Sequence, residues 1–144
     1  MAIRKSFLVY TDSLTKGRYH QGQSAIGGII INNEGYRVHD FATTLSHATK
    51  YEAKYVALLY GIEKAVALGA THVLAFTHSR LIVNQINGKS RITKENLKYY
   101  SSLVRSLESQ LKDLQVFAIN PSLNSHAIDL VRNELNRNNL EKKK

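Results

Sequence analysis

Two side chains that can bind divalent cations follow apolar segments of the kind that form strands. Asp12 comes after "KSFLVYT" (residues 5–11), and His78 comes after "THVLAFT" (residues 71–77). Carboxylates and imidazoles are both metal ligands, and sites in α/β domains are usually built at the carboxyl ends of the strands. We therefore expect Asp12 and His78 to lie near each other at one edge of a sheet.

The segments that must position these residues alternate between strand and helix patterns, and "NEG" (33–35) favours a hairpin turn. The predicted strands are 5–11, 25–32, 36–45, 71–77 and 114–120, and the predicted helices are 48–70, 79–88, 94–114 with Thr93 as N-cap, and 124–139. This order predicts an α/β fold: a five-stranded mixed sheet, with an antiparallel hairpin followed by parallel strands, flanked by helices.

Composition limits the class of protein. The chain has 144 residues, one proline and 43% hydrophobic residues, so we expect one domain over residues 1–138 and a basic tail over 139–144. The absence of cysteine excludes disulfides and thiolate metal sites. No apolar run approaches a membrane span, and the start lacks the pattern of a secretory signal, which predicts a cytoplasmic location.

Charge gives the first functional indication. Twenty Lys and Arg residues against eleven Asp and Glu residues give a formal charge of +9, which suits a polyanionic partner such as nucleic acid. Four basic residues, Lys16, Arg18, Lys50 and Arg80, fall in predicted loops or helix starts that border the Asp12 end of the sheet. The segment "KSRITKENLK" (89–98) predicts a basic ridge beside them.

Five segments, in this order along the chain, resemble segments of the type 1 ribonuclease H family. They are "VYTDS" (9–13), "GQSAIGGIIINNEG" (22–35), "ATKYEAKYVALLYGI" (48–62), "THSRLIVNQING" (77–88) and "NSHAIDL" (124–130). The resemblance covers nearly the whole chain. It implies the ribonuclease H fold and, in the family, hydrolysis of the RNA strand of RNA/DNA hybrids by two Mg²⁺ ions held by four carboxylates.

Transferring the four family carboxylate positions onto this chain gives Asp12, Lys54, His78 and Ile128. Only the first is an acid. An ammonium group at a metal position removes a ligand and also repels the cation. The resemblance therefore implies a degenerate active site that has lost two-metal hydrolysis, and no cofactor is expected.

Two alternatives remain at this stage. A one-residue insertion would bring Asp129 into the Ile128 position, and Asp12, His78 and Asp129 could then hold one Zn²⁺ or Mn²⁺ ion. The protein would in that case be an active ribonuclease H that needs Mg²⁺ or Mn²⁺. The other alternative is a protein-interaction scaffold, with a homodimer as one arrangement.

The same resemblance indicates residues that contact nucleic acid, either a hybrid or RNA. Lys50 and Tyr51 replace two family asparagines that touch the hybrid, whereas Asn124 retains a third. Ser79 either touches a ligand or caps the helix that it precedes. The predicted nucleic-acid site comprises Lys16, Arg18, Lys50, Tyr51, Ser79, Arg80 and Asn124.

Overall fold

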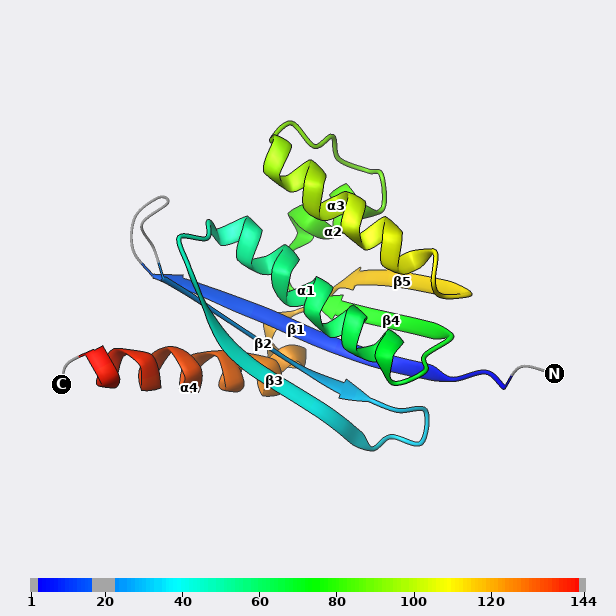
Figure 1. Ribbon diagram of the computed structural model, residues 1–144, viewed down its shortest axis with the longest axis horizontal. Coiled ribbons are helices and arrows are strands. Elements are labelled where there is room, and N and C mark those ends of the chain that lie inside the picture. Colours follow the sequence, from blue (N-terminus) through cyan, green and yellow to red (C-terminus); the bar gives the residue numbers. More distant parts are fainter. Residues whose placement is uncertain (1–2, 17–22, 143–144) are drawn as a thin grey trace.

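The computed structural model describes residues 3–16 and 23–142 of the chain (Figure 1). Its elements in chain order are β1 (Ser6–Lys16), β2 (Gln23–Ile31), β3 (Arg37–Ser46), α1 (Lys50–Ala67), β4 (His72–Thr77), α2 (Arg80–Ile86), α3 (Glu95–Glu108), β5 (Asp113–Ala118), the 3₁₀ turn η2 (Pro121–Asn124) and α4 (Ser125–Lys142).

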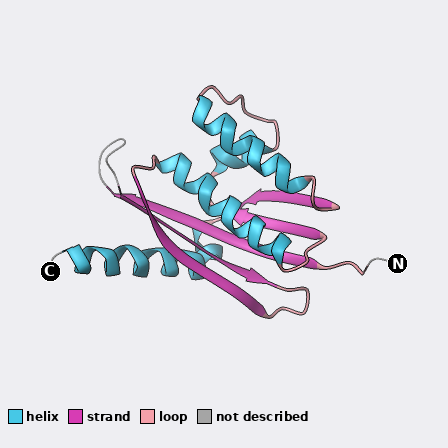
Figure 2. Ribbon diagram, viewed as in Figure 1, coloured by secondary structure: helices cyan, strands magenta, loops and turns pink. Residues whose placement is uncertain are grey.

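The strands form one five-stranded sheet in the order β3-β2-β1-β4-β5, as predicted. The first three strands pair antiparallel, and β1, β4 and β5 pair parallel. Figure 2 shows helices on both sides of this sheet. α1 crosses one face over β1, whereas α4 packs on the other face against β1, β2 and β3 (Figure 1).

Strand β1 is longer than the sequence pattern predicted. Its parallel pairing with β4 ends at Tyr10↔Phe76, but its antiparallel pairing with β2 continues to Lys16↔Gln23. The predicted end of this strand at residue 11 is therefore wrong, because pairing with β2 keeps residues 12–16 in the strand, although most of them are polar. Asp12 lies within β1, two residues beyond its last pair with β4.

Helix α1 begins and ends with local signals that the sequence contains. Thr49 Oγ1 accepts a hydrogen bond from the Glu52 amide, and the Glu52 carboxylate accepts one from the Thr49 amide, both at 3.2 Å. This reciprocal capping box fixes the start of the helix. Gly69, with a φ of 93°, follows its end, where the left-handed conformation favours glycine.

The other helix ends differ from the prediction. The N-cap of α3 is Lys94 instead of Thr93, and the helix ends at Glu108, well before residue 114, because the chain must turn to enter β5 beside β4. α4 extends to Lys142, so residues 139–142 of the predicted tail are helical. The domain boundary at residue 138 stays a prediction. No helix in the described ranges is long and apolar enough to cross a membrane.

The main core lies between α1 and the centre of the sheet. Tyr55, Leu58 and Ile62 of α1 are fully buried there against β1 and β4. At Gly61 a Cβ atom would lie 2.6 Å from Val9 Cγ1, so the helix approaches β1 closely at this position. Lys54 is two helical turns earlier on nearly the same face, and it therefore also faces β1.

Candidate functional site

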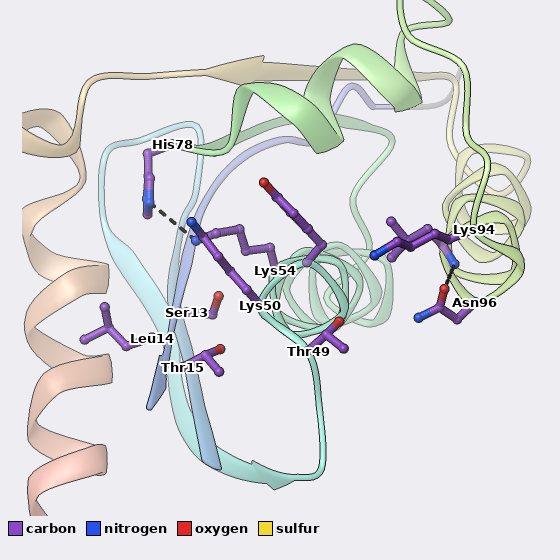
Figure 3. Close-up of a pocket in the computed structure, with 11 residues that line it drawn as sticks. Ser13, Leu14, Thr15, Thr49, Lys50, Lys54, His78, Lys94 and Asn96 are labelled. Carbon is purple, nitrogen blue, oxygen red and sulfur yellow. Dashed lines mark hydrogen bonds between the residues drawn. The ribbon is translucent and has the colours of Figure 1, made fainter. Parts of the chain in front are cut away.

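Asp12, Lys54 and His78 converge beyond the end of the β1–β4 pairing. His78 Nδ1 lies 2.8 Å from Asp12 Oδ1, and Lys54 Nζ lies 3.7 Å from the same oxygen. Lys54 Nζ is also 3.4 Å from His78 Nε2 (Figure 3). The carboxylate, the ammonium and the imidazole therefore form one contiguous cluster, supplied by β1, α1 and the end of β4.

Most of this cluster is removed from solvent. Asp12 is 2% exposed and Lys54 is 5% exposed, whereas the His78 side chain keeps 28% of its surface accessible. Burial lowers the pKa of Lys54, the nearby Asp12 carboxylate opposes that effect, and the charge of Lys50 adds to it. Lys54 is thus a desolvated amine whose positive charge depends on Asp12.

The two ring nitrogens of His78 face different partners. A lysine ammonium can only donate, so in its 3.4 Å contact with Lys54 the Nε2 atom of His78 is the accepting side, while Nδ1 faces Asp12. The Nδ1–Oδ1 contact is short but is not aligned as a hydrogen bond. The opposite unit charges of Asp12 and Lys54 cancel each other.

A pocket of about 640 Å³ opens over this cluster. It is lined by Ser13, Leu14, Thr15, Thr49, Lys50, Tyr51, Lys54, His78, Lys94, Asn96 and Leu97. Figure 3 shows the Lys50 and Lys54 side chains, one helical turn apart on α1, running toward His78, while Lys94 approaches from the α3 side. The walls of the pocket thus carry three ammonium groups and several hydroxyl and amide groups.

Buried polar atoms without a hydrogen-bond partner occur on β1, next to Asp12 in the chain, and on η2. In the part of the chain that the structure describes, they include Thr11 Oγ1, Ser13 Oγ and Asn124 Oδ1. Asn124 uses its amide nitrogen to donate a 2.9 Å hydrogen bond to the Thr11 carbonyl, which ties η2 to β1. Orphaned buried groups are uncommon and often mark a functional location.

The comparisons with known proteins identify the family. A family model described as reverse transcriptase-like matches residues 14–134. Ribonuclease HI of Halobacterium salinarum is 25% identical over 125 residues, which are 87% of this chain and 61% of that relative. The chain belongs to the ribonuclease H-like family. It spans about three fifths of the length of the curated relative that it matches.

Solved structures share the ribonuclease H fold with this chain. The ribonuclease H1 structure from Halobacterium salinarum has a TM-score of 0.84 and 23% identity, covering 92% of this chain and 98% of that one. The N-terminal ribonuclease H domain of a Mycobacterium tuberculosis protein has a TM-score of 0.87 and 20% identity, with coverages of 95% and 98%. LC11 ribonuclease H1, solved with an RNA/DNA hybrid, has a TM-score of 0.81 and 24% identity, with coverages of 91% and 97%.

In this ribonuclease H-like chain, three of the four transferred positions, Asp12, Lys54 and His78, converge. Ile128 is half-buried on α4, and Asp129 is exposed. Among the described residues, no group of three or more His, Cys, Asp or Glu side chains could hold a metal ion. The alternative in which Asp12, His78 and Asp129 hold one ion stays a prediction.

The donor set does not fit the two Mg²⁺ ions of the ribonuclease H family. Mg²⁺ requires hard oxygen ligands in octahedral geometry. The cluster instead offers one carboxylate, whose Oδ1 already faces an imidazole and an ammonium. Glu52 cannot replace Lys54, because its carboxylate belongs to the capping box at the start of α1.

Only some of the residues predicted to contact nucleic acid line the pocket. Lys50 and Tyr51 line the pocket, whereas Lys16 and Arg80 are exposed outside its lining. Ser79 is buried at the N-cap of α2 without a side-chain capping bond. Asn124 is 2% exposed and lines a different pocket, together with Leu123 and His126. Arg18 lies outside the described residues.

Several pocket residues were not selected from the sequence. Ser13 and Thr15 were assigned to a loop, and the extension of β1 places them in the pocket wall. Lys94 and Asn96 belong to the predicted basic ridge, and the position of α3 brings them opposite α1. Their basic and polar character was a signal, but nothing local indicated which of the ridge residues would face the site.

Proposed function

We propose that this ribonuclease H-like protein binds nucleic acid through its phosphate groups at the Lys50–Lys54–Lys94 pocket and has lost two-metal hydrolysis. One observation carries the proposal: the Lys54 ammonium lies 3.7 Å from Asp12 Oδ1, where the family places a metal ligand. Two unit positive charges about 4 Å apart repel by about 4 kcal/mol at an effective dielectric of 20, and a divalent ion doubles this repulsion.

The lysines of the pocket support an anionic ligand. Lys50 and Lys54 are one turn apart on α1, and the charge of Lys50 lowers the pKa of Lys54, so their ammonium groups repel each other. Like charges at this spacing destabilise a helix. Lys94 adds a third cation from the opposite wall. A phosphate between these groups would relieve the repulsion and would accept hydrogen bonds from all three lysines.

The class of ligand follows from the fold together with the charge. LC11 ribonuclease H1, whose structure resembles this chain, was solved with an RNA/DNA hybrid. The net charge of +9 suits a polyanion. Lysines bind phosphate without reading base sequence, so we expect affinity for hybrids and for RNA with little sequence preference.

Binding and cleavage should be measured separately. A fluorescently labelled RNA/DNA hybrid should increase in anisotropy on titration with the protein in EDTA, because lysines and not metal ions would hold the phosphates. The same hybrid should stay intact on a denaturing gel after incubation with Mg²⁺ or with Mn²⁺. The double variant Lys50→Gln/Lys94→Gln should lose most of the affinity, whereas the exposed, remote Lys112→Gln should retain it.

Two results would contradict the proposal. Hybrid cleavage that disappears in Asp12→Asn would mean that the acid still serves hydrolysis. Equal affinity of the double lysine variant and the Lys112→Gln control would mean that the pocket does not contact the nucleic acid.

A further inference from the structure

The charge of the pocket exceeds what one internal phosphate of a nucleic-acid strand neutralises. Lys50, Lys54 and Lys94 line the pocket, and the Asp12 carboxylate behind it cancels one of the three positive charges. The three lysines and this one carboxylate together present a net charge of plus two to the cavity. An internal phosphodiester carries a single negative charge. A terminal phosphate monoester carries about −1.5 to −2 near neutral pH and has three acceptor oxygens.

Two neighbouring acids are engaged elsewhere and do not line the pocket. Glu52 lies in the capping box at the start of α1, where it accepts from the Thr49 amide. Glu95 forms a 3.1 Å ion pair with Lys98 at the surface. Neither carboxylate lines the pocket.

A second, independent feature points to a polar ligand in the pocket. Ser13 is 2% exposed, its Oγ has no hydrogen-bond partner in the described chain, and it lines the pocket. Figure 3 shows Ser13 beneath the ends of Lys50 and Lys54. A buried hydroxyl without a partner is unfavourable, and an oxygen of a bound phosphate would satisfy it.

We propose that this pocket holds the terminal phosphate monoester of a nucleic-acid strand, with Lys50, Lys54, Lys94 and Ser13 as its contacts. The inference rests on the proposed function and adds the kind of phosphate that the site selects. The net charge of the pocket matches that of the monoester, and the lysines and the Ser13 hydroxyl supply donors for its three oxygens.

The surroundings give the rest of the strand a path out of the pocket. A smaller pocket of about 190 Å³ adjoins the first and shares Tyr51, Lys94 and Leu97 with it. Arg91 also lines this second pocket. The Tyr51 ring, with Lys50 Nζ 5.7 Å from its centroid, forms a wall at the junction where a sugar and base can pack. Arg91 is then placed to meet the next phosphate.

The test compares three versions of one labelled RNA 12-mer: 5′-phosphorylated, 3′-phosphorylated and hydroxyl at both ends. The Kd of at least one phosphorylated version should be lower than that of the hydroxyl version by on the order of tenfold. The reason is that the terminal phosphate adds negative charge and oxygens that accept charge-assisted hydrogen bonds from the lysines. Ser13→Ala and Lys50→Gln should each reduce that preference, whereas Lys112→Gln should leave it unchanged. Unlabelled inorganic phosphate and a 5′-mononucleotide serve as competitors.

The possible results separate the two proposals. Equal Kd values for the three RNAs would overturn the terminal-phosphate inference and leave nucleic-acid binding intact. No binding of any RNA or hybrid would overturn both proposals. Displacement of the RNA by an equal concentration of the mononucleotide would overturn the assignment to a strand end and indicate a free nucleotide as ligand.

Discussion

Asp12 is the residue on which the local balance of charge depends. Its carboxylate is 2% exposed and contacts both the Lys54 ammonium and the His78 imidazole. In a site of four carboxylates around metal ions, each acid repels the others when the metals are absent. Here the acid has the opposite effect, because it compensates a buried cation. The two kinds of site therefore respond in opposite directions when the acid is neutralised.

We predict that Asp12→Asn lowers the free energy of unfolding by about 3 kcal/mol, since it leaves the Lys54 ammonium buried without a counter-charge. Urea denaturation measures the effect. Asp40→Asn is the matched control: Asp40 pairs with Arg37 at 2.9 Å on the surface, with 53% of its side chain exposed, and its loss should change stability by less than about 1 kcal/mol. An Asp12→Asn protein as stable as the parent would contradict the compensating role.

The lowered pKa of Lys54 predicts a specific dependence on pH. Burial brings its pKa below the ordinary value of 10.5, so Lys54 loses its charge before exposed lysines do. Phosphate affinity should be complete below the lowered pKa and should fall as the pH rises through it. Stability should change in the other direction: between the lowered pKa and 10.5 the unfolded chain binds more protons, so the free energy of unfolding rises with pH.

Anisotropy titrations of a labelled RNA over a series of alkaline buffers measure this fall in affinity. The Lys54→Met variant keeps the approximate shape of the side chain but has no titrating amine. The decrease in affinity below the pH at which exposed lysines lose their charge should therefore be absent in this variant. Identical pH profiles for the variant and the parent would assign the decrease to other groups, of which Lys50, Asp12 and His78 are the charged or titratable neighbours.

At the scale of the elements, two packing relationships bring the cluster together. β1 continues past the end of its pairing with β4, which leaves Asp12 beside the end of that strand. α1 lies close over β1 because Gly61 has no side chain, and a Cβ there would come within 2.6 Å of Val9 Cγ1 and 2.9 Å of Thr11 Cγ2. The contact at Gly61 thus controls how near Lys54 comes to Asp12.

We predict that Gly61→Ala lowers the free energy of unfolding by about 2 kcal/mol, because the added methyl group forces α1 away from β1. Thermal or urea unfolding checks the loss. The exposed Glu63→Ala variant, two residues further along the same helix, should change stability by no more than about 0.5 kcal/mol. If the two variants were equally stable, the close approach of α1 to β1 would have no energetic importance.

At the scale of the whole molecule, the position of a positive charge matters more for nucleic-acid binding than the total charge of the protein. Lys94 lines the pocket beyond the carboxyl end of β4, whereas Lys112 precedes β5 at the other end of the parallel strands. Replacing either lysine by glutamine lowers the formal charge of +9 by one. Only Lys94 is placed to contact a phosphate of a bound strand.

We predict that Lys94→Gln reduces the slope of log affinity against log salt concentration by about 1, the contribution of one phosphate contact. Lys112→Gln should leave the slope as in the parent protein. The slopes follow from hybrid titrations at several salt concentrations. Equal changes in both variants would mean that general charge attraction, and not the pocket, holds the nucleic acid.

Local patterns in the sequence were sufficient for the order of elements and for the family. The period of apolar residues gave α1, the "NEG" turn gave the hairpin, and the ordered family segments identified Asp12, Lys54 and His78 as site positions. The family and the order of elements are confirmed, because helix and strand periodicity and family segments are properties of short stretches of chain. The functional role of the three site positions stays a prediction.

Only the tertiary structure decided what these positions form. The length of β1 depends on pairing with β2, the burial of Lys54 depends on the approach of α1 at Gly61, and the position of Lys94 depends on where α3 packs. Each involves residues far apart in the chain, whose contacts no local pattern encodes. The sequence by itself determined which charges are present, and long-range packing determined that Asp12 and Lys54 neutralise each other behind a cationic pocket.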